Sequence, residues 1–225
     1  MELDVFLAEL AGWAQERDPG FETVAYGDDA DQVIDVRRGG RRQAIVLHGG
    51  FWRPAFTRAN TRAIAVDLAL RGWTSWNVEY RRAGVDATLA DVEAALGTIG
   101  GGTAIGHSAG GHLALWAAGT DAVDRAVSLA GVTDLVRGAR EGIGAGAVVE
   151  FAGEDPPARA DPMRRLPLHA PALLVHGTDD DRVPVDYSRT FAAVSGAELL
   201  ELPGVGHFEL IDPRTDAWAR VVERL

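Results

Sequence analysis

The chain has 225 residues, with 22 basic and 33 acidic side chains and a formal net charge of −11. It contains no cysteine, and every basic residue is an arginine. These absences exclude thiol nucleophiles, disulfides, cysteine-ligated zinc and any reaction that needs a lysine amine. The acidic balance argues against nucleic acid or an anionic membrane as a partner. Any catalysis must use hydroxyl, imidazole, carboxylate or main-chain groups.

Composition and length fit one soluble globular domain. The chain is 47% apolar and 24% charged, which is ordinary for such a domain, and we expect residues 1–225 to share one core. Residues 1–5 carry acids where a signal peptide needs basic residues, and no run of about 18 apolar residues occurs. We therefore expect a cytoplasmic protein without a membrane partner. Its oligomeric state stays open, a homodimer included.

The predicted elements begin with a helix and a hairpin. Residues 1–17 have apolar side chains at helical spacing, which predicts a helix on the outside of a sheet. The segments 21–26 and 32–37 are separated by a short turn and predict an antiparallel hairpin at one edge.

Short apolar runs then alternate with segments of helical spacing. The runs predict strands at 43–47, 74–78, 103–105, 126–129 and 172–175. The spacing predicts helices at 61–71, 86–99, 110–118, 186–194 and 215–225. This alternation indicates an α/β fold with a mostly parallel sheet and helices on both faces. The irregular segment 131–168, with 38 residues, exceeds an ordinary connection, and we expect a small cap or an insertion there.

The motif G-x-S-x-G at 106–110 offers Ser108 as a nucleophile. A predicted strand precedes it and a predicted helix follows it. A strand, a sharp turn and a helix place a serine hydroxyl at the carboxyl edge of a sheet. Ser108 in this context predicts nucleophilic catalysis, whereas a glycine-rich turn with a solvent serine is the alternative.

An activated serine needs an imidazole and a carboxylate that fixes its tautomer. His207 lies in a glycine-flanked loop after the apolar run 199–202. Three consecutive aspartates, Asp179, Asp180 and Asp181, follow the strand predicted at 172–175. Only one of the three can face the histidine. The order serine, aspartate, histidine is that of the α/β-hydrolase arrangement.

A tetrahedral intermediate also needs amide donors where its oxyanion forms. We expect these from Ala109, which follows the nucleophile, and from Gly50 or Phe51 in the loop after the strand at 43–47. Trp52 in the same loop is a candidate for contact with the substrate, with core packing as the equal alternative. His48 is expected to be buried and structural. No metal-ligand spacing occurs, so we expect no metal and no cofactor.

With these residues assembled, the chain resembles the α/β-hydrolase superfamily. The motifs are H-G-G-F-W at 48–52, W-N-V-E-Y-R-R at 76–82, G-H-S-A-G-G-H-L-A at 106–114, H-G-T at 176–178 with its aspartates, and G-V-G-H-F at 204–208. The first looks like the kynurenine formamidase (arylformamidase) branch and related small esterases, although Phe51 stands where those formamidases usually have tyrosine. The fourth is similar to prolyl-oligopeptidase-like peptidases, and this resemblance implies Asp180 as the acid, with Asp181 as the runner-up.

The sequence thus predicts a serine hydrolase that cleaves small esters through Ser108, His207 and Asp180 and an acyl-enzyme. The expected partner is a small-molecule ester or amide. The first alternative is an arylformamidase. A peptidase is disfavoured because the chain is too short for the propeller domain of the large oligopeptidases. A non-catalytic binding protein of the same fold is the alternative from another class.

Overall fold

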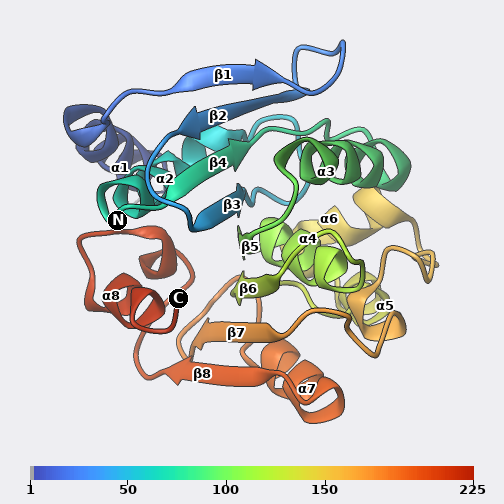
Figure 1. The fold of residues 1–225 in the computed structure, drawn as a ribbon. Helices are drawn as coiled ribbons and strands as arrows, with labels where there is room; N and C mark the ends of the chain where they lie inside the picture. Colours follow the sequence, from blue (N-terminus) through green and yellow to red (C-terminus); the bar gives the residue numbers. More distant parts are fainter. Residues whose placement is uncertain (1–2) are drawn as a thin grey trace.

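A computed structural model describes residues 3–225 of the chain (Figure 1). The helix predicted at 1–17 is α1 (Leu3–Arg17), and its first two predicted positions lie outside the described residues. Within residues 3–225, no helix is both long and apolar enough to cross a membrane.

The strands of the described chain form one eight-stranded sheet in the order β1-β2-β4-β3-β5-β6-β7-β8. They are β1 (Glu22–Ala25), β2 (Val33–Arg37), β3 (Gln43–Leu47), β4 (Thr74–Val78), β5 (Thr103–His107), β6 (Arg125–Leu129), β7 (Ala172–Gly177) and β8 (Glu198–Leu202). β2 is antiparallel to β1 and to β4, and the remaining pairs are parallel. The predicted α/β fold and its antiparallel edge hairpin are confirmed.

Helices cover both faces of the sheet (Figure 1). One layer holds α1, α2 (Arg62–Leu70) and α8 (Asp216–Val222), whose buried side chains belong to one apolar cluster. The other holds α3 (Val85–Ile99), α4 (Ala109–Ala118) and α7 (Asp186–Ser195), which share a second cluster. Each sheet face therefore has its own core.

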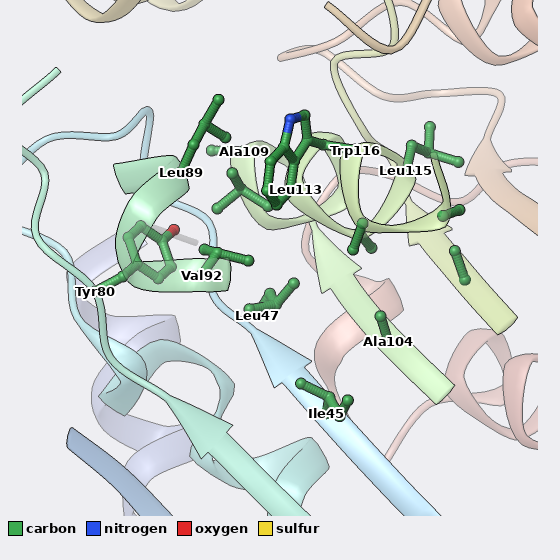
Figure 2. Close-up of a cluster of buried hydrophobic side chains, with 14 of the residues drawn as sticks. Ile45, Leu47, Tyr80, Leu89, Val92, Ala104, Ala109, Leu113, Leu115 and Trp116 are labelled. Atoms are coloured by element: carbon green, nitrogen blue, oxygen red, sulfur yellow. The ribbon is translucent and has the colours of Figure 1, made fainter. Parts of the chain in front are cut away.

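Strand β3 shows how the sequence divides between the two cores. Ile45 and Leu47 belong to the cluster under α3 and α4, and Figure 2 shows them below Val92. Ala44 and Val46 belong to the cluster on the opposite face. Because successive side chains of a strand point to opposite faces, a continuous apolar run serves both layers.

The segment 131–168 is more regular than its sequence indicates. It forms α5 (Leu135–Glu141), α6 (Ile143–Ala152) and the 3-10 turn η2 (Pro162–Arg164). Glycines lower helix propensity here, and three residues at the start of α6, 144–146, have left-handed backbone. The helices form because Leu135, Val148 and Phe151 are buried in the core under α4.

Candidate active site

Ser108 lies on a sharp turn between β5 and α4. Its backbone has φ 55° and ψ −115°, a conformation that residues with a side chain rarely adopt. The flanking glycine is required, because a methyl group at Gly106 would lie 1.9 Å from the Gly110 carbonyl oxygen. The Ser108 amide donates to the Leu129 carbonyl at 2.8 Å and fixes the turn to β6. The G-x-S-x-G motif therefore has the predicted strand, turn and helix.

His207 and Asp180 come from the loops that follow β8 and β7. His207 Nδ1 lies 2.7 Å from Asp180 Oδ2, and both side chains are buried. The Asp181 side chain is 74% exposed and lies 3.3 Å from Arg182. Because the carboxyl ends of parallel strands meet at one sheet edge, Asp180 and His207 lie at the same edge as Ser108. The structure brings Asp180, and not Asp181, to the histidine.

Hydrogen-bond donors surround the Asp180 carboxylate. Oδ1 accepts from the amides of Arg182 and Val183, both at 2.8 Å. Oδ2 lies 2.7 Å from His207 Nδ1 and 3.2 Å from His176 Nε2. Burial would raise the pKa of Asp180, but the hydrogen bonds from the two imidazoles outweigh burial and hold that pKa well below its usual range. The ionised carboxylate keeps a proton on His207 Nδ1, so Nε2 is free to accept one.

Two further histidines support this pair. His107 Nε2 donates to the His207 carbonyl oxygen at 2.9 Å. Burial, followed by the neighbouring His207 ring, lowers the pKa of His107 to about 3, so its ring stays neutral. His176 lies four residues before Asp180 and accepts a hydrogen bond from the Ser188 hydroxyl, 2.7 Å from its Nδ1. Sequence reasoning missed the His176 contact, although the four-residue spacing after a strand end was visible.

The loop after β3 runs directly beside the nucleophile. A methyl group at Gly49 would lie 2.8 Å from the His107 carbonyl oxygen and 3.1 Å from Ser108 Cβ. Gly50 and Phe51 follow with φ of 111° and 58°. Only a glycine at position 49 allows the loop to approach Ser108 this closely.

The predicted oxyanion donors lie in this loop and at the start of α4. Within residues 3–225, the amides of Gly50, Phe51 and Ala109 donate no hydrogen bond to the protein. Ala109 is the first residue of α4, where helix geometry leaves N–H groups without a partner inside the helix. These amides can therefore receive an anionic oxygen beside Ser108.

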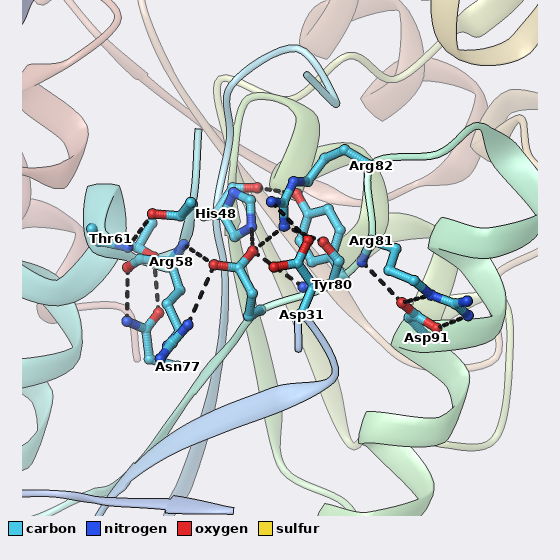
Figure 3. Close-up of polar contacts among 12 residues, drawn as sticks. Asp31, His48, Arg58, Thr61, Asn77, Tyr80, Arg81, Arg82 and Asp91 are labelled. Atoms are coloured by element: carbon cyan, nitrogen blue, oxygen red, sulfur yellow. Dashed lines mark hydrogen bonds and ion pairs between the residues drawn. The ribbon is translucent and has the colours of Figure 1, made fainter. Parts of the chain in front are cut away.

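A buried polar network holds the loop from below (Figure 3). His48 Nδ1 lies 2.8 Å from the Gly49 carbonyl oxygen, and His48 Nε2 lies 2.9 Å from the Glu79 carboxylate. Tyr80 stacks on the His48 ring and donates its hydroxyl to the His48 carbonyl oxygen at 2.6 Å. Glu79 also accepts from the Arg58 amide at 3.0 Å. The buried, structural place expected for His48 is confirmed.

Ser108 and His207 line one small cavity of about 30 Å³. Its other walls come from α1, from residues 49–60 after β3, from the end of β5 and from residues 208–211. They are Leu3, Leu7, Gly49, Gly50, Phe51, Phe56, Asn60, His107, Phe208 and Ile211.

Trp52 lies away from this cavity. It is 4% exposed and stacks on Phe151 of α6 with ring centroids 4.5 Å apart. The sequence prediction that Trp52 contacts the substrate does not match this position, and the packing alternative does. With positive φ at both Phe51 and Trp52, the chain reverses so that Phe51 lines the cavity and Trp52 enters the core.

Sequence reasoning missed most of the apolar cavity wall. Phe208 could have been found, because it directly follows His207. Leu7 could not, because its spacing within α1 is the same as that of residues that face the core, such as Leu10.

Comparisons with known proteins agree with this arrangement. Residues 101–198, which include Ser108 and Asp180, match the family model of the prolyl oligopeptidase family. The chain is also 30% identical to the esterase LipC of Mycobacterium tuberculosis over 84% of its length, and it spans 60% of that relative.

Solved structures share the fold over nearly the whole chain. A putative thioesterase from Silicibacter sp. TM1040 has a TM-score of 0.80 and 18% identity, covering 98% of this chain and 94% of that one. The chain therefore has the α/β-hydrolase fold. An esterase of Thermogutta terrifontis has a TM-score of 0.73 and 22% identity, covering 92% of this chain and 90% of the esterase. That esterase has also been solved phosphoramylated by tabun. The resemblance to kynurenine formamidases stays a prediction that depends on the loop motif.

Proposed function

We propose that this chain belongs to the α/β-hydrolase superfamily and is a serine hydrolase that cleaves small carboxylic esters through an acyl-enzyme. The observation that carries the proposal is the 2.7 Å hydrogen bond between His207 and Asp180, with Ser108 in the same cavity as His207. The esterase names of the relatives from Mycobacterium tuberculosis and Thermogutta terrifontis support ester substrates.

The proposed reaction begins at Ser108. Its hydroxyl oxygen attacks the ester carbonyl carbon while His207 Nε2 takes the hydroxyl proton, and Asp180 stabilises the imidazolium that forms. The carbonyl oxygen becomes an anion that accepts hydrogen bonds from Ala109 and from Gly50 or Phe51. When the tetrahedral intermediate collapses, His207 gives the proton to the leaving alcohol. A water molecule, deprotonated by His207, then attacks the acyl-enzyme and releases the acid and Ser108.

Side chains and main-chain amides supply every group in this scheme, so the proposed reaction needs no metal or cofactor. The partner is a small-molecule ester. We also propose that residues 1–225 act as one hydrolase domain with 131–168 as its small cap. Two contacts support the cap: Arg53 Nε, after the glycine loop, lies 2.7 Å from Glu150 of α6, and a methyl group at Gly144 would lie 2.2 Å from the Phe51 ring.

The test is a serine replacement with a matched control. Ser108→Ala should reduce turnover of 4-nitrophenyl acetate by about 10³-fold or more and abolish labelling by a fluorophosphonate probe. Ser195→Ala, at the end of α7 and outside the cavity, should keep both. Retained hydrolysis in Ser108→Ala, or a wild-type protein that neither labels nor turns over any ester, would refute the proposal.

The H-G-G-F-W loop favours an arylformamidase as the second candidate. That activity uses the same serine, base and amide donors on an N-formyl bond, so the two candidates separate only by substrate. N-formylkynurenine and short-chain 4-nitrophenyl esters should be compared on one preparation. A higher kcat/KM for the formamide would replace the ester proposal, and a higher value for the esters would remove the formamidase.

A further inference from the structure

Two cavities of very different size meet at His207. The first is the 30 Å³ cavity that holds Ser108, which we call the small cavity. The second, which we call the large cavity, has a volume of about 530 Å³ and is lined by Phe6 of α1, by Asp181 and by Glu209, among others. Leu3, His207 and Phe208 line both. His207 therefore stands at the boundary between a confined space and a roomy one.

The chemistry of acyl transfer assigns a part of the substrate to each cavity. The carbonyl carbon must lie within reach of Ser108 and of the amide donors in the glycine loop, all of which belong to the small cavity. The leaving oxygen must lie against His207 Nε2, which protonates it. The acyl chain then continues into the small cavity, and the leaving group continues past His207 into the large one.

The two cavity volumes limit the size of the acyl group and of the leaving group differently. The centres of water-sized atoms can occupy about 30 Å³ in the small cavity and about 530 Å³ in the large one, so the small cavity is by far the tighter of the two. We therefore expect the small cavity to accept an acetyl group more readily than a butyryl or hexanoyl group. The large cavity lies within the range of about 300–1,000 Å³ that is typical of pockets for whole small molecules.

The acyl limit depends on the helix α1, which lies far from Ser108 in the sequence. Leu7 and Phe56 are apolar residues that line the small cavity together with Ser108 and His207. Phe56 also touches the glycine loop, because a methyl group at Gly50 would lie 2.1 Å from Phe56 Cβ. Leu7 is the cleaner position to change, because it belongs to α1 and to no catalytic loop.

We propose that the site selects esters with an acetyl-sized acyl group on a bulky leaving group, and that Leu7 is the residue that sets the acyl limit. This inference rests on the proposed ester hydrolysis and specifies its substrate class. It predicts that a larger acyl group lowers kcat/KM, whereas a larger leaving group raises it.

The acyl side is tested with 4-nitrophenyl acetate, butyrate and hexanoate, which share one leaving group. Wild-type kcat/KM should fall steeply from acetate to hexanoate. Leu7→Ala should raise the butyrate-to-acetate ratio by about tenfold, the scale of a methylene or two in an apolar pocket. Leu7→Phe should lower the ratio. Val5→Ala, which shortens an apolar side chain that is 50% exposed on the same helix, should leave it unchanged.

The leaving-group side is tested with the acetates of phenol and 4-phenylphenol, whose leaving-group acidities are similar. The larger ester should have the higher kcat/KM, because only it fills the large cavity. A flat acyl series in the wild type, or an unchanged ratio in both Leu7 variants, would overturn the acyl limit. A preference for the phenyl ester would overturn the leaving-group assignment. In either case fluorophosphonate labelling of Ser108 persists, whereas failure of the proposed function removes labelling and turnover together.

Discussion

The side chain of His107 donates a hydrogen bond from Nε2 to the main-chain carbonyl of His207 at 2.9 Å. The residue that precedes the nucleophile thus fixes the loop that carries the base. The two rings also lie side by side, with centroids 4.5 Å apart. Serine and imidazole are therefore positioned relative to each other by a direct bond between the end of β5 and the loop that carries His207.

His107→Phe removes this donor and keeps a planar ring. Because the His207 carbonyl then loses its partner, we expect kcat for acetate esters to fall about tenfold, the scale of one hydrogen bond, with little change in KM. His107→Gln can still donate from its side-chain amide and should recover part of the loss. A fall in melting temperature with normal kcat in both variants would show that the bond only stabilises the fold.

Asp180→Asn should reduce kcat by about 10⁴-fold, whereas Asp181→Asn should have little effect. All four contacts to the Asp180 carboxylate come from donors, so an amide NH₂ group must face one of them. If it faces His207, the proton moves to Nε2 and the ring can no longer accept one from Ser108. Steady-state kinetics of the two variants in parallel will decide, and a larger loss at Asp181 would contradict this geometry.

Glu79→Gln should lower the free energy of unfolding by about 3 kcal/mol, because it removes the buried negative partner of an ion-pair network. The Glu79 side chain is 2% exposed and forms ion pairs with Arg82 and Arg58. Urea unfolding measures the change, and Glu93→Gln, an exposed glutamate on α3, is the matched control. Equal stability of the two variants would show that the network under the glycine loop contributes little.

Stability should decrease as the pH falls from about 6.5 to 4. Burial lowers the pKa of His112 to about 4, while the unfolded chain titrates near 6.5. Between these values the unfolded state binds more protons, so unfolding becomes more favourable as the pH falls. This residue alone accounts for about 3 kcal/mol over the interval. His112→Gln should flatten the pH dependence of the urea midpoint, and an unchanged slope would show that His112 is not the group responsible.

The parts of the fold that sequence predicts well are those that depend on local pattern. The strands at 43–47 and 74–78 begin and end as predicted. The first is a nearly continuous apolar run, and the second alternates Trp76 and Val78 with polar residues. The turn at Ser108 was recognisable from its G-x-S-x-G motif, because the close approach of the Gly110 carbonyl requires glycine at position 106. In 131–168 the glycine content hid two helices that form only because their apolar residues pack under α4.

The residues of the site were likewise predictable where they depend on a local motif or on chain order. Chain order and a motif singled out Ser108 and His207, whose spatial relation follows from the parallel sheet. The choice among three adjacent aspartates came from a family resemblance, and burial now distinguishes Asp180 from Asp181. The position of Trp52 depends on two consecutive left-handed residues, which no side-chain pattern indicates.

The walls of the small cavity come from both ends of the described chain, from Leu7 in the first helix to Ile211 just before the last. A partly folded molecule in which α1 has not docked lacks one of these walls, although Ser108, His207 and Asp180 are all on other elements. The ratio of long-chain to short-chain ester turnover is therefore a reporter of folding. During refolding it should start high and decline as α1 seats, giving a kinetic signal for the docking of the first helix that total activity alone does not provide.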